Sequence, residues 1–452
     1  MNRNVLIIIT ASIVSLLLAF FLPFKPMENK GLALLVLVAI LWLTEAMHIT
    51  ATALMIPVLA VFLGISETKP ALVAFADPTI FLFFGGFAIA TALSVQKLDF
   101  YIANKVMALS NGNFFISIIL LFTVTATLSM GISNTAAAAM MIPLAIGMLR
   151  QLDYKTHKGT FIFVILGIAY SANIGGMGTV IGSPPNAIVA SQMKLTFADW
   201  LLYGMPFMII LMPLMILVLY LVFRPNFKQN IEINTSNEPL NKKQILTLVI
   251  FGTVSLCWIL GGFLNPLFSG WLGIQKIESF DSIVALAVSV VICATGVANW
   301  KQIQEHTDWG VLMLFGGGLT LSAVLTNTGA NKILVEGIVF LIEGKHFFWI
   351  GLLVATFVIF LTEFTSNTAA AALLVPLFIS IATALDMNPL GLTMIVGLGA
   401  SCAFMLPVAT PPNAIAFGTG LIKQKDMLKA GFYLNIVSII LISIMAYLFW
   451  YH

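Results

Sequence analysis

Charged residues are scarce in this chain. They make up 9% of its 452 residues, whereas 60% are hydrophobic and the mean hydropathy is +1.05. A soluble domain carries about 25% charged residues, so this chain has too little polar surface to face water on all sides. Its apolar runs reach the length of about 20 residues that a helix needs to cross a membrane. They are continuous rather than alternating, which argues against transmembrane strands. We therefore predict an all-α integral membrane protein that contacts lipid.

Cysteines are also few. Cys257, Cys293 and Cys402 lie in apolar runs without CxxC spacing, which indicates buried thiols and neither a disulfide nor a metal site. The net charge of +3 gives no reason to expect a nucleic-acid partner. The apolar N-terminus, residues 5–21, resembles a signal peptide but has no clear cleavage motif before Pro23, so a first transmembrane helix is the preferred interpretation.

Two short motifs occur twice, in the same order. SNTAAAAMMIPLA at 133–145 recurs as SNTAAAALLVPLF at 366–378, and GSPPNAI at 182–188 recurs as ATPPNAI at 409–415, so the two motifs repeat at almost the same offset. A third pair has a similar offset: Asp77 with Gly85-Gly86, and Asp308 with Gly316-Gly317. The glycine pairs are typical of close helix packing. These offsets predict an internally duplicated protein whose site is built from both halves.

The apolar runs predict spans at residues 5–23, 31–47, 50–65, 78–95, 200–223, 245–264, 282–298 and 430–450, another span that opens at Asp308, and interfacial helices at 97–111 and 328–345. The runs 113–149 and 346–385 are interrupted at SNT, as kinked helices or re-entrant hairpins. The runs 160–195 and 390–422 are interrupted at PPN. We expect scaffold helices at 1–75 and 245–306, repeats at 76–223 and 307–452, and a cytoplasmic linker at 224–244.

The distribution of basic residues predicts the orientation. With a cytoplasmic N-terminus, an external C-terminus and two hairpins, fourteen of the 21 Lys and Arg residues lie on the cytoplasmic side of the inner membrane. The loop after the first SNT run is basic (Arg150, Lys155, Lys158), whereas the loop after the second carries no basic residue. Equivalent loops therefore face opposite sides. Inverted repeats with broken helices are typical of secondary transporters.

The four interruptions predict an anion site. Non-helical backbone at membrane depth is tolerated where it lines a hydrated cavity, and a helix N-terminus there offers free N–H groups and a partial positive charge. No Lys or Arg lies in any interruption. Because a buried carboxylate without compensating charge is costly, bound Na⁺ ions would have to supply that charge.

A few polar residues have more than one interpretation. Ser129 lies four residues before Ser133, as Thr362 does before Ser366. This spacing places hydroxyls on one helix face as cation ligands or as back-bonds to the helix. Glu45 and His48 are either proton-linked or an interfacial structural pair, the latter being preferred. Glu363 stands where the first half has Met130, and it either tunes the site or faces water.

The paired SNT and PPN motifs, together with WLTEA at 42–46, resemble the divalent anion:sodium symporter (DASS) family. The resemblance covers nearly the whole chain. It implies about 11 transmembrane helices plus two re-entrant hairpins, a homodimer formed through a scaffold domain, and an elevator mechanism. The substrates it implies are C4 dicarboxylates such as succinate, malate and fumarate.

By this resemblance, sodium site 1 consists of Ser129, Ser133, Asn134 and Gly182, and sodium site 2 of Thr362, Ser366, Asn367 and Ala409. The substrate-binding residues it implies are Ser133, Asn134, Thr135, Ser183, Ser366, Asn367, Thr368, Thr410 and Pro411.

Sodium-coupled dicarboxylate uptake is the preferred function. The alternatives are dicarboxylate exchange without net sodium coupling and transport of citrate or another divalent oxyanion. An intramembrane enzyme would need a motif such as HExxH or GxSxG, and neither is present. We therefore expect no enzymatic activity.

Overall fold

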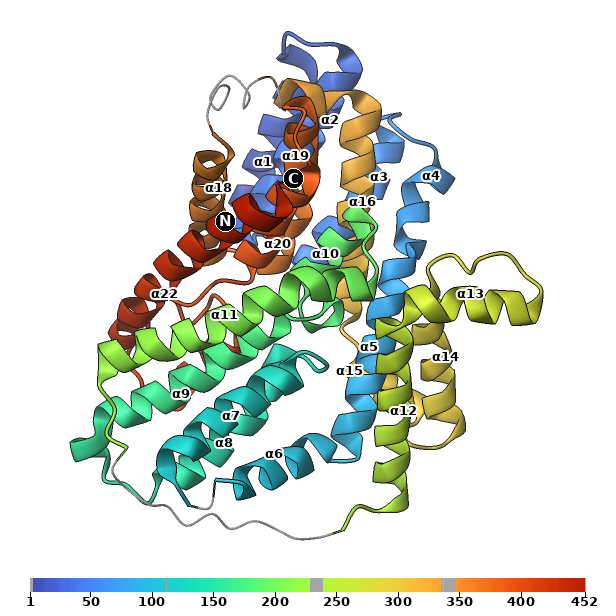
Figure 1. Ribbon diagram of the computed structural model, residues 1–452. Coiled ribbons are helices and arrows are strands. Elements are labelled where there is room, and N and C mark those ends of the chain that lie inside the picture. The colour runs from blue at the N-terminus through green and yellow to red at the C-terminus, as the bar shows by residue number, and fades with distance from the viewer. Residues whose placement is uncertain (1–2, 111, 228–238, 335, 337–345, 452) are drawn as a thin grey trace.

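The computed structural model describes residues 3–110, 112–227, 239–334, 336 and 346–451 (Figure 1). All regular elements among these residues are helical. Nine described helices are long and apolar enough to cross a membrane, and six shorter apolar helices accompany them. The predicted all-α membrane fold is confirmed, whereas the count of 11 spans stays a prediction.

The first half follows the predicted order closely. The SNT interruption separates α7 from α8, and the PPN interruption separates α9 from α10. The short helices α4 and η1 were not predicted. The elements are α1 (Arg3–Phe21), α2 (Pro26–Thr44), α3 (Ile49–Phe62), α4 (Thr68–Val73), η1 (Ala74–Ala76), α5 (Pro78–Val95), α6 (Leu98–Ala108), α7 (Phe114–Ser129), α8 (Asn134–Leu149), α9 (Tyr154–Gly176), η2 (Val180–Gly182), α10 (Pro184–Met193) and α11 (Phe197–Phe223).

In the second half the SNT interruption separates α18 from α19, and the PPN interruption separates α20 from α21. The elements are α12 (Lys242–Ile259), α13 (Gly261–Leu272), α14 (Phe280–Ala294), α15 (Trp300–His306), α16 (Trp309–Thr328), α18 (Phe347–Thr362), α19 (Asn367–Ala384), α20 (Pro389–Ala400), α21 (Pro411–Gly418), α22 (Gln424–Met445) and the π-helical turn η3 (Ala446–Trp450). Much of the predicted interfacial helix 328–345, and residues 228–238 of the predicted linker, lie outside the described residues.

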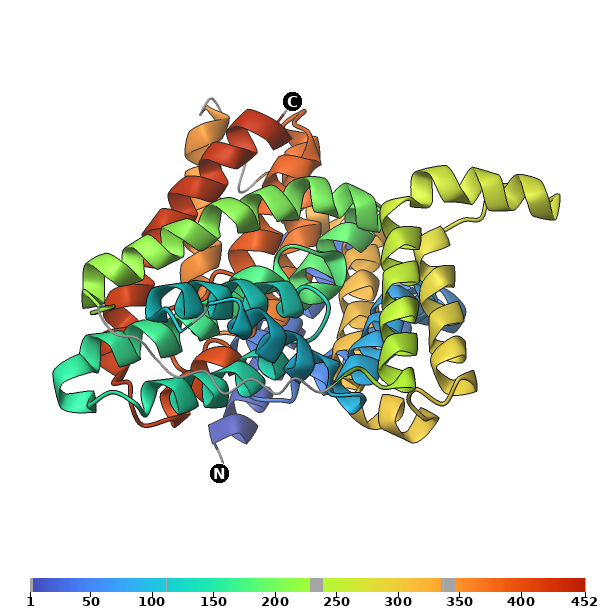
Figure 2. The same cartoon turned by 60° about the horizontal axis from the view of Figure 1, so that its bottom comes forward.

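The prediction of one span over 245–264 was wrong at its end. The helix stops at Ile259, and the chain continues from Gly261 as the separate helix α13. Two consecutive glycines at the junction weaken the helix because glycine loses the most backbone entropy on ordering. Both Figure 1 and Figure 2 show α13 projecting away from the other helices.

The helices pack in two groups. In one group α5 packs against α14, and α16 packs against α3. In the other, α9 packs against α7, α8 and α11, while α20 packs against α18 and α19. Helices α10 and α19 also contact helices of the first group, namely α5 and α16. The PPN and SNT elements therefore lie where the two groups meet.

One glycine of each pair permits a close contact between helices of the first group, in agreement with the prediction. A Cβ atom on Gly85 would lie 2.4 Å from Cβ of Ala285, and one on Gly317 would lie 2.6 Å from Cβ of Ala53. Only glycine allows helix backbones to approach this closely.

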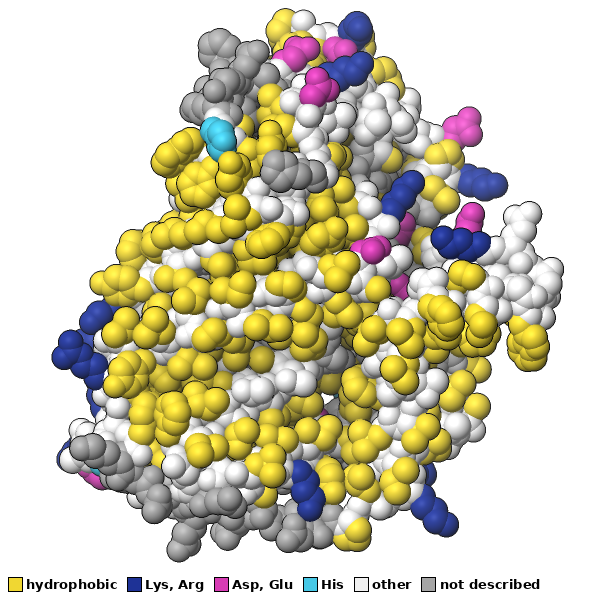
Figure 3. Space-filling view, viewed as in Figure 1, with side chains coloured by type: hydrophobic (Ala, Val, Ile, Leu, Met, Phe, Trp, Pro, Cys, Tyr) yellow, Lys and Arg dark blue, Asp and Glu magenta, His cyan; other side chains and the backbone are white. Residues whose placement is uncertain are grey.

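The molecular surface suits a lipid environment. Hydrophobic side chains cover most of the face in Figure 3, and charged side chains gather toward its edges. The two ends of the chain lie at opposite ends of the molecule in Figure 2. These features fit a chain that crosses a bilayer.

Candidate functional site

Each SNT motif begins a helix after a sharp interruption. Oγ of Ser133 accepts a hydrogen bond from the backbone N–H of Ala136 at 3.2 Å, and Oγ of Ser366 accepts one from Ala369 at 3.4 Å. Both serines are therefore N-caps. Helix α7 packs against α8, and α18 packs against α19. Side-by-side packing of these neighbours favours two hairpins over two kinked helices.

Each PPN asparagine closes the preceding interruption in the same way. Nδ2 of Asn186 donates to the carbonyl oxygens of Gly176 and Thr179 at 2.8 and 2.7 Å. Nδ2 of Asn413 donates to those of Ala403 and Leu406, both at 3.1 Å. Gly176 and Thr179 correspond to Ala403 and Leu406 at the same sequence offset that separates the two PPN motifs. The repeat therefore extends from the motifs to the backbone that they hold.

Each second interruption begins before the PPN motif and ends at its prolines. Helix α9 ends at Gly176, and Pro184 already belongs to the first turn of α10. Pro411 likewise begins α21. Proline is favoured at a helix start because its missing N–H has no helical partner there. The non-helical chain therefore precedes the PPN motif rather than including it.

The four helix starts meet at one cavity of about 400 Å³. All the predicted substrate-binding residues line it, as do Gly182 and Ala409. Ser129 and Thr362, both fully buried, do not line it. Among the described lining residues none is Lys or Arg, and Asp308 is the one charged side chain. The cavity thus combines the positive ends of helices with no basic counter-ion.

Oxygen atoms crowd around Asn134. The amide atom placed as Oδ1 lies 2.6 Å from Oγ of Ser129, 3.1 Å from the carbonyl oxygen of Gly182 and 3.2 Å from that of Ala172. Of these four oxygen atoms only the hydroxyl of Ser129 carries a hydrogen, so most of the contacts would lack a hydrogen-bond donor. The amide is therefore rotated, so that its nitrogen donates to the surrounding oxygens.

The second half is less crowded at the same place. Oδ1 of Asn367 is buried without a hydrogen-bond partner. The hydroxyl of Thr362 donates to the carbonyl oxygen of Ile359 on its own helix, so the back-bond interpretation holds for Thr362. It does not hold for Ser129, whose hydroxyl contacts Asn134 and Ala172 instead.

Glu363 does not face water. It is 1% exposed, and its carboxylate accepts hydrogen bonds from the backbone N–H groups of Phe404, Met405 and Leu406. The side chain of Asn435 donates to it as well, at 2.7 Å. Glu363 therefore ties the second hairpin to the chain that precedes α21.

His48 has a structural role. Its Nδ1 accepts a hydrogen bond from the N–H of Thr50 at 3.3 Å and so caps α3. Glu45 ends α2 in a left-handed conformation, with φ of 49°. The pairing of Glu45 with His48 at the interface stays a prediction.

Two further residues of the cavity were not predicted. Nδ2 of Asn173, on α9, donates to Oγ1 of Thr410 at 3.0 Å, and the hydroxyl of Ser401 lies 3.2 Å from that of Ser183. Each bond joins one half to the other. The sequence indicates Asn173 and Ser401 only as polar residues in apolar runs that shortly precede a PPN motif.

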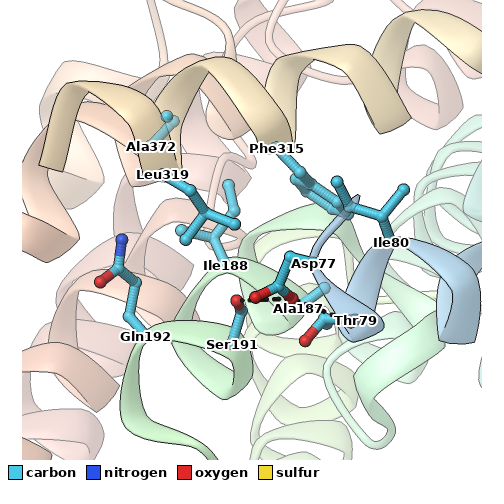
Figure 4. Close-up of a pocket in the computed structure, with 11 residues that line it drawn as sticks. Asp77, Thr79, Ile80, Ala187, Ile188, Ser191, Gln192, Phe315, Leu319 and Ala372 are labelled. Carbon is cyan, nitrogen blue, oxygen red and sulfur yellow. Dashed lines mark hydrogen bonds between the residues drawn. The ribbon is translucent and has the colours of Figure 1, made fainter. Parts of the chain in front are cut away.

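A much smaller cleft, of about 10 Å³, lies where α5, α10 and α16 meet (Figure 4). Asp77 caps α5 by accepting from the N–H of Thr79, and it also accepts from the hydroxyl of Ser191 on α10 at 3.1 Å. The cleft is too small for a dicarboxylate. It marks a polar contact between the two groups of helices.

Comparison with known proteins gives several similarities. The model of the citrate transporter family (CitMHS) matches residues 39–397 and, in a second match, 271–452. An uncharacterized transporter of Haemophilus influenzae is 62% identical over 450 residues, which are 99% of this chain and 98% of that protein. The sodium-dependent dicarboxylate transporter SdcS of Staphylococcus saprophyticus is 32% identical over 464 residues, covering 94% of this chain and 88% of that protein.

A solved structure is also similar. The crystal structure of the Alcanivorax borkumensis YdaH transporter, described as having an unusual topology, matches with a TM-score of 0.57 at 13% identity. The match covers 84% of this chain and 87% of that chain. At this identity the similarity concerns the fold alone.

Proposed function

Because the chain belongs to the citrate transporter family of the divalent anion:sodium symporters, we propose that this multi-pass membrane transporter moves C4 dicarboxylates together with Na⁺. Succinate, malate and fumarate are the proposed substrates. The carrying observation is the cavity in which four helix N-termini meet without a described Lys or Arg. Helix N-termini stabilise carboxylates, and cations must supply the remaining positive charge.

The two SNT motifs bind the two ends of the substrate in this proposal. Ser133, Asn134 and Thr135 offer hydroxyl, amide and backbone donors to one carboxylate, and the equivalent residues of the second half offer them to the other. Ser183, Thr410 and Pro411 complete the lining. Donors that do not carry a full charge hold the substrate without binding it too tightly to release.

Sodium binds beside each SNT motif in this proposal. Site 1 comprises Ser129, Ser133, Asn134 and Gly182, of which the last three line the cavity and Ser129 contacts Asn134. Site 2 comprises Thr362, Ser366, Asn367 and Ala409, and the unpartnered Oδ1 of Asn367 supports it. Na⁺ at both sites would neutralise the dicarboxylate, so ion and substrate enter the cavity together.

The transport step is an elevator movement of the second helix group against the first, between inverted repeats. The separate packing of the two groups supports this proposal. We propose that the N-terminus lies in the cytoplasm and the C-terminus outside, which the distribution of Lys and Arg supports. We further propose a homodimer in the cytoplasmic membrane.

Uptake by proteoliposomes tests the function. Radiolabelled succinate is expected to accumulate when an inward Na⁺ gradient is imposed and not when K⁺ or choline replaces Na⁺. Equal uptake in all three salts would reject sodium coupling in favour of exchange. Excess unlabelled citrate tests the second candidate substrate, which the family description favours. Uptake of radiolabelled citrate without uptake of succinate would replace C4 dicarboxylates with citrate.

A further inference from the structure

Asn173 occupies an unusual position in the cavity. It lies in α9, in the first half, and is 2% exposed, yet its side chain reaches the cavity wall beside Thr410 of the second half. Its Nδ2 donates both to Oγ1 of Thr410 at 3.0 Å and to Oδ1 of Asn413 at 3.2 Å. The side chain is thus fixed by two partners.

The hydrogen-bond network determines which way the Asn173 amide points. Asn413 donates through Nδ2 to the carbonyl oxygens of Ala403 and Leu406, so the atom it turns toward Asn173 is its oxygen. That oxygen needs a donor. Asn173 therefore presents nitrogen to Asn413, and its own Oδ1 is left as an acceptor that no described residue uses.

Thr410 is oriented by the same network. Its Oγ1 accepts from Nδ2 of Asn173 and from the backbone N–H of Asn413 at 3.3 Å. A hydroxyl oxygen has two lone pairs and one hydrogen. Because both lone pairs are engaged, the hydroxyl hydrogen of Thr410 is available to donate into the cavity. An acceptor and a donor consequently lie side by side on this wall.

We propose that Asn173 is a specificity-determining residue that selects 2-hydroxy dicarboxylates through a hydrogen bond from the substrate hydroxyl to its Oδ1. A 2-hydroxycarboxylate carries a carboxylate acceptor and a hydroxyl donor on neighbouring carbons, and these match Thr410 and Asn173 in turn. Succinate lacks the hydroxyl and leaves Oδ1 of Asn173 without a donor. The proposal rests on the proposed transport of dicarboxylates and names the feature that distinguishes among them.

The equivalent contact around Asn186 lacks an asparagine in the position of Asn173. The offset that relates Asn186 to Asn413 makes Ala400 the counterpart of Asn173, and Oδ1 of Asn186 is buried without a partner. The fold already accommodates an alanine and an unpartnered asparagine oxygen at the equivalent place. Asn173→Ala would reproduce this arrangement in the second half, so the variant is expected to fold.

The test compares kcat/KM for succinate, L-malate and D-malate in proteoliposomes of the full chain. We expect the wild type to prefer one malate enantiomer, since a single fixed acceptor meets the hydroxyl of only one. Asn173→Ala is expected to lower the ratio of that enantiomer to succinate by about threefold to tenfold, the contribution of one hydrogen bond. Asn173→Ser, which lacks the carbonyl oxygen, is expected to change the ratio in the same direction.

Tyr170→Phe is the matched control. Tyr170 lies three residues earlier on α9, and its hydroxyl donates to the carbonyl oxygen of Phe404 at 2.6 Å without lining the cavity. Its loss removes a contact with the second half but should leave the malate ratios unchanged. Unaltered enantiomer ratios in Asn173→Ala and Asn173→Ser would overturn the proposal. A wild type that takes up no dicarboxylate would reject the proposed function instead.

Discussion

Gly85 lies against Ala285, and this contact has a counterpart in which the two halves exchange roles. Gly317 lies against Ala53, and one and the same sequence offset separates Gly85 from Gly317 and Ala53 from Ala285. Each half therefore contributes the glycine to one contact and the alanine to the other. Such reciprocal contacts arise when two repeats are related by an approximate twofold axis.

Gly85→Ala is expected to destabilise the packing of α5 on α14. The added Cβ would lie 2.4 Å from Cβ and 2.6 Å from the carbonyl oxygen of Ala285, so the helices must separate. Overpacking of this kind costs about 1–3 kcal/mol. Thermal unfolding in detergent should show a lower midpoint. Gly252→Ala on α12 is the control because its Cβ would have no neighbour within 4 Å, and an equal loss in both variants would contradict the packing explanation.

Asn134→Ala and Asn367→Ala are each expected to abolish sodium-dependent uptake while the protein stays folded. Both amides line the cavity, and Oδ1 of Asn367 is buried without a hydrogen-bond partner. Transport assays and size-exclusion chromatography measure the two properties separately. Ser380→Ala, which removes a hydroxyl bonded within α19, should transport normally. Normal uptake by either asparagine variant would reject that residue as part of the site.

Glu363→Gln is expected to destabilise the chain that precedes α21. The carboxylate accepts from three backbone N–H groups and from Asn435, whereas a glutamine would turn its own N–H groups toward some of these donors. Hydrogen bonds to a charged group contribute about 1.5–3 kcal/mol. A lowered unfolding midpoint measures the loss.

Glu305→Gln is the control for Glu363→Gln. Glu305 is 59% exposed and pairs with Lys301 at 3.9 Å. Exposed pairs of this kind contribute about 0–1 kcal/mol. If the two glutamine variants unfold at the same temperature, the hydrogen bonds of Glu363 do not stabilise the hairpin.

Ser191→Ala is expected to shift the balance between conformations of the transporter. The hydroxyl of Ser191 on α10 donates to Asp77 at the start of α5 (Figure 4), and an elevator movement must break this bond. Its loss should favour the other conformation by about threefold to tenfold. Val408, which lines the cavity and is 84% exposed, provides the site for a labelling assay.

The assay uses Val408→Cys in a chain whose three native cysteines are replaced. A membrane-impermeant maleimide applied from the open side of the cavity is expected to react more slowly when Ser191→Ala is present. Thr123→Ala removes a hydroxyl bonded within α7 and should leave the rate unchanged. Identical rates with and without Ser191→Ala would show that this contact does not hold the present conformation.

The sequence by itself determined the class of protein, the duplication and the local geometry of the motifs. The low content of charged residues and the continuous apolar runs show that the chain lies in a lipid bilayer. They also predict helices, because a helix satisfies its backbone hydrogen bonds internally and can therefore cross a bilayer. N-caps such as Ser133 and Ser366 depend on residues three positions away, so a short motif contains the whole interaction. The prolines that begin α10 and α21 are local in the same sense.

The tertiary structure alone decided which polar groups meet. Asn173 and Thr410 are 237 residues apart, and Glu363 finds its partners 41 to 72 residues away. Composition and spacing carry no record of such pairings, because they arise when packed helices bring distant backbone and side chains into register. The separate helix α13 was missed for a related reason: its apolar sequence continues that of α12, and the junction lies at a glycine pair rather than at a proline or a charge.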